Sequence, residues 1–187
     1  RDVSLDVFFG TDYHSHLGTR RGGMVLFDKK EGFQRQIHNI ENTPFRTKFE
    51  RDLADFRGHA GLGCISDSDP QPLLVRSHLG LYAIVTVGII NNTDELVKAY
   101  LSDKGQQFLT LSSGRVNVTE LTAALINQEN DLVSGILHAM EVIDGSMTIL
   151  ILTEEGEIIA ARDSMGRLPV LIGQREDGYC VSFESFA

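Results

Sequence analysis

The stretch GLGCISDSDPQPLLVRSHLGLYAIVTVGIINNTDEL, residues 61–96, decides the fold that is predicted for this chain. Gly61 and Gly63 bring the backbone into a compact strand that ends near Ser66, and the next four residues have the composition of a turn. Two more strands are predicted over residues 72–75 and 81–90. The second is apolar at nearly every position, so it needs a packed layer on each face.

The residues before this stretch predict two helices and a strand. Apolar residues recur at helical spacing over residues 3–17, and Gly18 follows as the expected C-cap. Residues 24–27 have the pattern of a strand, and residues 28–43 that of a loop or an irregular strand pair. Pro44 suits the first turn of a short helix that extends through Phe56.

The residues after the stretch predict three helices and four strands. Asn92 and Asn117 are expected to cap the first two helices, and the third covers residues 131–143. Its apolar stripe is Val133, Ile136, Leu137 and Met140. The strands are expected at residues 146–153, 157–161, 169–173 and 179–183. Helices and strands in separate blocks favour one α+β domain, with two packed sheets and helices outside each.

Composition excludes several classes of partner. The chain has 187 residues, about one domain, and its net charge of −9 disfavours nucleic acid and anionic membranes as partners. Small molecules and proteins remain. Only two cysteines occur and no apolar run is long enough to span a bilayer, so a cytoplasmic location is expected. Because the chain starts at Arg1 and stops at Ala187 directly after a predicted strand, it is expected to be incomplete at both ends.

Several short strings, in a shared order, resemble one protein family. AARDSMGRLP at residues 160–169 resembles the alanine-arginine-aspartate segment of class II glutamine amidotransferases, which continues with a glycine and a proline. SFES at residues 182–185 resembles the serine-glutamate-serine strand end of amidophosphoribosyltransferases. HLG at 16–18 with Gly23, PQP at 70–72 and NTDEL at 92–96 fall on further segments of that family. Asparagine synthetase-type amidotransferases, which share the arginine-aspartate segment, rank second.

The resemblance implies a fold and a wider context. The fold would be that of the N-terminal-nucleophile hydrolases, a four-layer αββα sandwich, with residues 1–187 forming one glutamine amidotransferase type 2-like domain. This domain would be the glutaminase half of a longer purine-biosynthesis protein, followed by a phosphoribosyltransferase-like domain. A homo-oligomer is expected, and no cofactor is expected in this domain.

The chemistry of the family can be compared with this sequence position by position. Glutamine hydrolysis there needs an N-terminal cysteine, an oxyanion hole and charged groups that bind the α-carboxylate and α-amino group. Arg1 is no such nucleophile, and the family's first strand would lie ahead of it, so no catalytic residue is assigned.

The substrate-binding positions are Ser66, Val87, Gly88 and Val118. The family's register places Ser66 at the carboxylate-binding arginine, Val87-Gly88 at the oxyanion asparagine-glycine, and Val118 at the aspartate that holds the α-amino group. The Gly88 N–H is expected to survive as a donor, whereas a lost side-chain donor costs about 3–4 kcal/mol of transition-state stabilisation in known enzymes.

These departures predict a domain that is inactive toward glutamine and has a structural or regulatory role. An alternative is an active amidotransferase or hydrolase, whose nucleophile lies upstream or whose small substrate lacks glutamine's zwitterionic head. A pure assembly module is a third hypothesis.

Other reactive residues have simpler explanations. Asp12, His14 and His16 could suggest a metal site, but His14 and His16 would point to opposite sides of a helix, so no metal site is expected. Cys64 and Cys180 are interpreted as a buried structural thiol and a core residue, respectively.

Two charged pairs and one glycine pair remain. Arg20 and Arg21 could bind an anion or solvate a turn, and the sequence leaves both open, while Arg162 and Asp163 are expected to form an ion pair that shapes their turn. Gly61 and Gly63 form no phosphate loop, since the lysine and the serine or threonine of that motif do not follow.

Overall fold

The computed structural model describes residues 1–103, 106–109, 111–112 and 114–185; the predicted chain end at Ala187 lies outside these residues. The helices are α1 (Ser4–Tyr13), α2 (Phe45–Phe49), α3 (Thr93–Ser102), α4 (Val118–Ile126) and α5 (Leu132–Val142), with the 3-10 helices η1 (His14–Leu17) and η2 (Asp52–Ala54). The strands are β1 (Arg21–Asp28), β2 (Gly32–Asn39), β3 (Ala60–Ser66), β4 (Leu73–Ser77), β5 (Gly80–Ile90), β6 (Leu111–Ser112), β7 (Arg115–Val116), β8 (Gly145–Thr153), β9 (Ile158–Arg162), β10 (Leu171–Arg175) and β11 (Gly178–Ser182).

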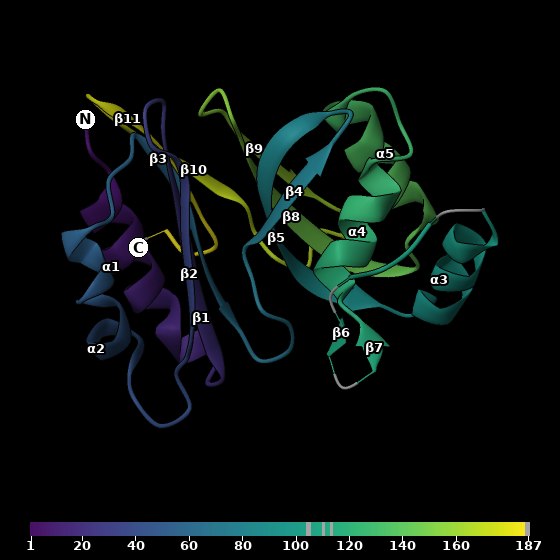
Figure 1. Ribbon diagram of the computed structural model, residues 1–187, viewed down its shortest axis with the longest axis horizontal. Helices are drawn as coiled ribbons and strands as arrows, with labels where there is room; N and C mark the ends of the chain where they lie inside the picture. The colour runs from purple at the N-terminus through teal and green to yellow at the C-terminus, as the bar shows by residue number, and fades with distance from the viewer. Residues whose placement is uncertain (104–105, 110, 113, 186–187) are drawn as a thin grey trace.

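Two antiparallel sheets stack face to face between two helical layers (Figure 1). One sheet has the order β2-β1-β3 and carries α1 and α2 on its outer face. The other has the order β4-β5-β8-β9 and carries α4 and α5. The pairs β6–β7 and β10–β11 form two small separate ribbons. The predicted four-layer αββα sandwich is confirmed.

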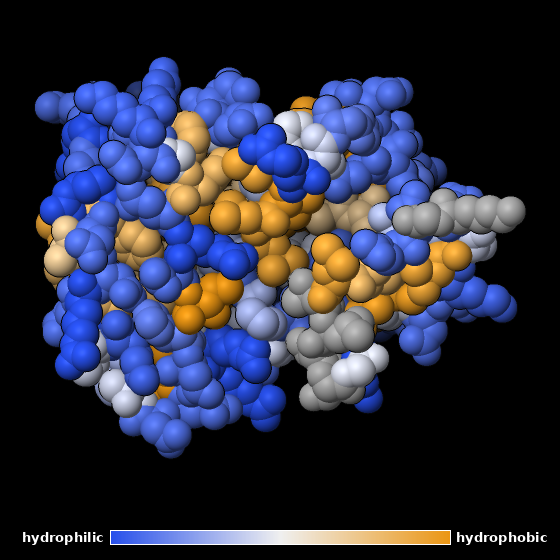
Figure 2. All heavy atoms as spheres, viewed as in Figure 1, coloured by the Kyte–Doolittle hydropathy of each residue, from blue (hydrophilic) through white to orange (hydrophobic). Residues whose placement is uncertain are grey.

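Each interface between layers has its own apolar core. One cluster, with Phe8, Phe45 and Phe49, lies between the first helical layer and the β2-β1-β3 sheet. A second, with Leu62 and Val85, lies between the two sheets, because alternate residues of β3 and β5 point there. The third packs α4 and α5 against the outer face of β5 and β8. Figure 2 shows apolar residues gathered in the middle of the visible face, over β4 and β5, with hydrophilic residues on both sides.

Two predicted features near the N-terminus are refined by the structure. Residues 32–39, expected to be a loop or an irregular strand pair, form the regular strand β2, which pairs with β1 along its whole length. Polar residues suit β2 because it is an edge strand with little burial. Gly18 does follow the helical segment, but its φ of −165° is extended. Glycine fits there because a Cβ would lie 2.9 Å from Cγ2 of Ile65.

Two further predictions were wrong in detail. Asn92 makes no capping hydrogen bond; its amide donates to the Val142 carbonyl and accepts from the Asp144 N–H, tying the start of α3 to the end of α5. The stripe of α5 was half right: Ile136 and Met140 pack against the core, whereas Val133 and Leu137 are 59 % and 65 % exposed. Gly135 and Ala139 are buried beside Ile136. Gly135 permits this approach because a Cβ there would lie 2.3 Å from the Ile126 carbonyl oxygen.

Candidate functional site

The loop of residues 67–72, between β3 and β4, connects the elements that carry the predicted site. Ser66 ends β3, and its Oγ accepts a hydrogen bond from the Ser68 N–H at 3.2 Å. Asp69 is only 6 % exposed, and its Oδ2 accepts from the Val118 N–H at 2.9 Å. Val118 is the first residue of α4, so this carboxylate lies at the positive end of the helix dipole. The chain therefore places its own anion at the N-terminus of α4.

Gln71, in the same loop, binds the loop to β5. Its side chain is 5 % exposed and forms two hydrogen bonds with one residue: Nε2 donates to the Thr86 carbonyl at 3.0 Å, and Oε1 accepts from the Thr86 N–H at 2.7 Å. The Thr86 hydroxyl in turn lies 2.7 Å from the hydroxyl of Thr119 on α4. Gln71 thus takes the place of a neighbouring strand beyond the end of β4, and it fixes the part of β5 that precedes Val87 and Gly88.

The orientation of Gly88 follows from the register of the sheet. Gly88 is opposite Met147 on β8, and Met147 directs both its N–H and its carbonyl toward Asp163, on the far side. The pair of Gly88 and Met147 is therefore a non-hydrogen-bonded pair, in which each backbone points away from the other. The Gly88 N–H points to the same edge of β5 as the Thr86 N–H, which donates to Gln71. No described residue accepts from the Gly88 N–H. Its role as a donor to a substrate stays a prediction.

Glycine is also the residue that this register requires. A Cβ on Gly88 would lie 1.9 Å from the Ser146 carbonyl oxygen, well inside van der Waals contact. Neighbouring Val87 shares the parity of Ala83 and Val85, whose side chains lie between the two sheets. Any side-chain donor of the kind that asparagine supplies is absent there, which leaves one backbone N–H at this point of β5.

The four predicted substrate-binding residues lie on connected elements, but their side chains do not share one face. Ser66 has the parity of Leu62 and Cys64 on β3, so it points between the sheets, as Val87 does. Val118 instead packs against the cluster between α4 and the outer face of β5. None of the four side chains carries a charge.

Asp67, the first residue of loop 67–72, binds the loop to the segment that precedes β1. Its Oδ1 accepts from the backbone N–H groups of Thr19 and Arg20, at 2.6 and 3.1 Å. The Thr19 N–H is the largest cause that lowers the pKa of this carboxyl group, and burial opposes it only in part. The Arg20 side chain reaches the Asp67 carbonyl at 3.5 Å and Glu41 at 3.8 Å, so it contacts groups of the chain itself. These contacts favour the turn-stabilising interpretation for Arg20.

The two thiols differ in exposure. Cys64 is 7 % exposed, and burial raises its pKa to about 12, so the thiolate is not formed at neutral pH. The expectation of a buried structural thiol is confirmed. Cys180 was predicted to be a core residue and is exposed, so that prediction was wrong. In the part of the chain that the structure describes, the apolar strand β11 pairs with β10 alone, and Cys180 is left exposed.

The remaining charged candidates have partners within the protein. Asp12 accepts two hydrogen bonds from Arg46, at 2.8 and 3.1 Å. His14 Nε2 lies 3.2 Å from the Ser182 hydroxyl, and His16 Nε2 lies 3.4 Å from Glu184. Across the described ranges, no group of three or more His, Cys, Asp or Glu side chains is placed to hold a metal ion.

The predicted ion pair of Arg162 and Asp163 is not formed. Asp163 accepts instead from the backbone N–H groups of Met147 and Gly166, at 2.7 and 2.9 Å. Burial opposes ionisation of Asp163, but these backbone donors outweigh it and lower its pKa overall. The turn is therefore shaped by a carboxylate with backbone donors, which a sequence pattern cannot distinguish from an ion pair.

Sequence reasoning missed the roles of Asp69 and Thr86. The run Ser66–Pro70 indicated a turn, and nothing in it marked Asp69 as buried. A carboxylate that follows a strand and precedes a proline gives no such signal alone. Asn117, by contrast, was predicted as a cap: its Oδ1 accepts from the N–H groups of Thr119 and Glu120, although its buried Nδ2 has no partner among the described residues.

Comparisons with known proteins agree on one group. Residues 60–186 match the family model described as "Glutamine amidotransferase domain". The amidophosphoribosyltransferase of Archaeoglobus fulgidus is 25 % identical over 92 % of this chain, and that of Methanocaldococcus jannaschii is 26 % identical over 100 %. The solved structure of glutamine phosphoribosylpyrophosphate amidotransferase from B. subtilis, complexed with ADP and GMP, superposes with a TM-score of 0.80 at 27 % identity over 95 % of this chain.

The match covers only part of each relative. The chain spans 38 % of the Archaeoglobus protein, 40 % of the Methanocaldococcus protein and 38 % of the solved B. subtilis chain. The structural similarity confirms the N-terminal-nucleophile hydrolase fold. Within the described residues, no helix is both long and apolar enough to cross a bilayer.

Proposed function

Because this chain belongs to the family of glutamine amidotransferase domains and is related to amidophosphoribosyltransferases, we propose that it is a glutaminase-like domain that no longer hydrolyses glutamine. Its role in this proposal is structural or regulatory, within a protein related to purine biosynthesis. The family and the fold come from the comparisons, whereas the lost activity rests on the residues of the site.

The observation that carries the proposal is the Asp69 carboxylate at the N-terminus of α4. The family resemblance places the group that holds glutamine's α-amino nitrogen at Val118. Here the Val118 N–H already donates to buried Asp69, and the Val118 side chain is apolar. The Val118 side chain offers the ammonium group of an incoming zwitterion no acceptor, and the carboxylate of buried Asp69 already accepts from the Val118 N–H.

The oxyanion position supports the same conclusion. The Gly88 N–H is the only backbone donor that we assign there, and Val87 supplies none. The lost side-chain donor corresponds to about 3 kcal/mol, or more than a hundredfold in rate, before any loss of glutamine affinity is counted.

The direct test is glutamate release from glutamine by protein with its native N-terminus. We expect no turnover above the spontaneous rate, and no heat of binding when millimolar glutamine is titrated. A protein that releases glutamate at an enzymatic rate would refute the proposal, whichever residue proved to be the nucleophile.

A second candidate function is hydrolysis or group transfer on a different small substrate. The free N–H of Gly88 beside an apolar Val87 favours it, because a substrate without a zwitterionic head would not need the missing charges. A thermal-shift screen against amides and other small metabolites tests this candidate. A ligand that stabilises the wild-type protein but does not stabilise the Val87→Asn variant would support it.

The wider context is also a proposal. We propose that a phosphoribosyltransferase-like domain follows this chain and that the family's first strand precedes it. The greater length of the relatives supports the domain that follows. The strand that precedes is supported by β3, which pairs in the described sheet with β1 alone and so has an edge where a further strand could pair. Reading the coding sequence on both sides tests both. Light scattering of the longer protein tests the predicted homo-oligomer. The cytoplasmic location and the lack of a cofactor stay predictions.

A further inference from the structure

Arg21, the first residue of β1, faces the candidate site, and the sequence left open whether it binds an anion. A Cβ on Gly22 would clash with a phenyl ring of α2, so Gly22 faces the helical layer. A Cβ on Gly23 would clash with the Gln71 carbonyl oxygen, so Gly23 faces loop 67–72. Because side chains alternate along a strand, Arg21 is directed to the same side as Gly23. The guanidinium group therefore lies on the face of β1 that the loop covers.

Ser66 lies directly opposite Arg21 in the β1–β3 pair. Opposite residues of an antiparallel pair have Cβ atoms about 4.5–5.5 Å apart, so the guanidinium and the Ser66 hydroxyl border one space. Ser66 Oγ accepts from the Ser68 N–H at 3.2 Å and lies 3.4 Å from the Ser68 hydroxyl, so its own O–H makes no short hydrogen bond with Ser68. A guanidinium beside a hydroxyl donor suits a carboxylate, which accepts at both oxygens.

Arg21 is half-buried, and its guanidinium pairs with no described group. The nearest carboxylates along the loop, Asp67 and Asp69, both accept from backbone N–H groups of other segments. None of the residues outside the described ranges, 104–105, 110, 113 and 186–187, has an acidic side chain. A partly desolvated cation without a carboxylate partner favours an anionic ligand.

Loop 67–72 connects this cation to the rest of the candidate site. It leaves β3 beside Arg21 and crosses to the other sheet (Figure 1), where Gln71 pairs with Thr86. Gly88 lies two residues beyond Thr86, about 7 Å along β5. Arg21 and the Gly88 N–H therefore lie at the same end of the sandwich.

We propose that Arg21 and Ser66 bind the carboxylate of a small ligand that carries no ammonium group beside it. The guanidinium donates to one or both carboxylate oxygens, and the Ser66 hydroxyl donates to one of them. The exclusion of an ammonium group rests on the second candidate function above, in which apolar Val87 and Val118 offer it no acceptor. The carboxylate contact of Arg21 does not rest on that function.

Isothermal titration of the full-length protein with matched five-carbon amides tests the proposal. Glutaramate is glutamine without its α-amino group, and glutaramide replaces the carboxylate of glutaramate with a neutral amide. We expect glutaramate to bind with a Kd below about 1 mM, and glutaramide and glutamine to bind at least about tenfold more weakly. The proposal is overturned if glutaramate does not bind, or if glutaramide or glutamine binds as tightly. Glutamate release, measured separately, refutes the proposed loss of activity instead.

Arg21→Gln and Arg51→Gln form the matched pair of variants. Arg51 is exposed, has no described partner and lies between α2 and η2, in the helical layer outside the β2-β1-β3 sheet. Arg21→Gln should weaken glutaramate binding by about tenfold or more, and Arg21→Lys by less, because lysine keeps the charge but loses the paired donors. Arg51→Gln should leave binding unchanged. Equal affinities of Arg21→Gln and Arg51→Gln for glutaramate would overturn the proposal.

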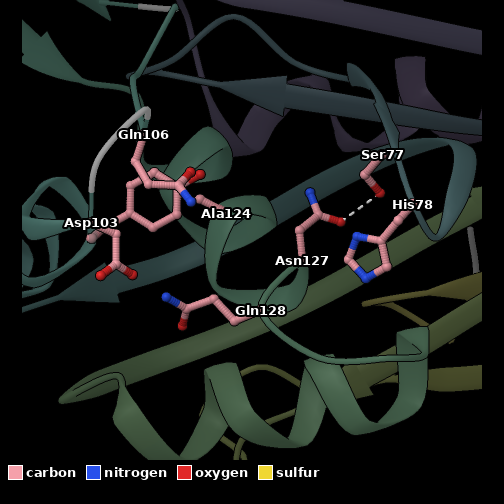
Figure 3. A pocket seen from close by; sticks show the side chains of 8 residues that line it. Ser77, His78, Asp103, Gln106, Ala124, Asn127 and Gln128 are labelled. Carbon is pink, nitrogen blue, oxygen red and sulfur yellow. Dashed lines mark hydrogen bonds between the residues drawn. The ribbon is translucent and has the colours of Figure 1, made fainter.

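A polar hollow at the other end of α4 supplies a control of position. Its lining includes Ser77, His78 and Asn127, and the Ser77 hydroxyl donates to Asn127 Oδ1 at 2.8 Å (Figure 3). Asn127 follows the last residue of α4 and Val118 is the first, so roughly 13 Å of helix separates the hollow from the candidate site. His78→Ala should therefore leave glutaramate binding unchanged. An effect as large as that of Arg21→Gln would place the ligand in the hollow and overturn the proposal.

Discussion

Replacing Gln71 tests whether loop 67–72 holds the site together. In Gln71→Ala the N–H and carbonyl of Thr86, both buried beyond the end of β4, lose their partners. Each unpaired buried group costs about 1–3 kcal/mol, so we expect the free energy of unfolding to fall by about 2–6 kcal/mol. Typical domains are stable by about 5–15 kcal/mol, so this loss would be a large fraction of the total.

Urea unfolding followed by far-UV circular dichroism measures this change, because the chain has no tryptophan. Gln71→Met keeps most of the side-chain volume and loses both hydrogen bonds, so it separates their contribution from that of the cavity. Gln36→Ala, at an exposed position of β2 with no described side-chain partner, is the matched control. If Gln71→Ala and Gln71→Met both stay within about 1 kcal/mol of wild type, the two bonds do not support the site.

Three other predictions concern single residues. Native protein should show one fast-reacting thiol with a disulfide reagent at pH 8, and Cys180→Ser should abolish it, since Cys64 is buried with a pKa of about 12; two fast thiols would contradict this. Asp163 has a pKa lowered from 3.8, so its contribution is complete above that value and is lost as the pH falls through the folded pKa. Denaturation at pH 7 and at pH 3 should therefore show a smaller pH dependence in Asp163→Asn, and an unchanged dependence would contradict it. Asn117→Ala should lower the free energy of unfolding by about 1 kcal/mol through the lost cap, and Asn117→Ser by less, because serine keeps the acceptor and removes the unpaired amide; equal losses in urea melts would contradict it.

The layered fold was largely predictable because hydrophobic patterning follows burial. The run of apolar residues in β5 required cover on both faces, and the structure supplies it with β1–β3 on one side and α4 on the other. Patterning failed where an apolar strand lacks such cover. Cys180 on β11 was expected in the core because its neighbours are apolar, yet a two-stranded ribbon has no second layer to bury it.

The candidate site was predictable only at the level of the backbone. The donor role of Gly88 stays a prediction, and the register of β5 adds that a side chain at this position would clash with the Ser146 carbonyl. The burial of Asp69 was not predictable, since it depends on a contact with Val118, 49 positions along the chain.

These contacts explain how the framework of the candidate site can be maintained without any contact to a ligand. Gln71 fixes Thr86, Thr86 fixes Thr119, and Asp69 binds the first N–H of α4, so loop 67–72 connects β3, β5 and α4 by itself. The geometry of the site is therefore maintained by internal hydrogen bonds. Selection for a folded domain alone would preserve Gly88 and Gln71, whereas nothing in the folding energetics requires a charge at Val118. A framework stabilised in this way can lose its ligand contacts one residue at a time, without losing the fold that identifies its family.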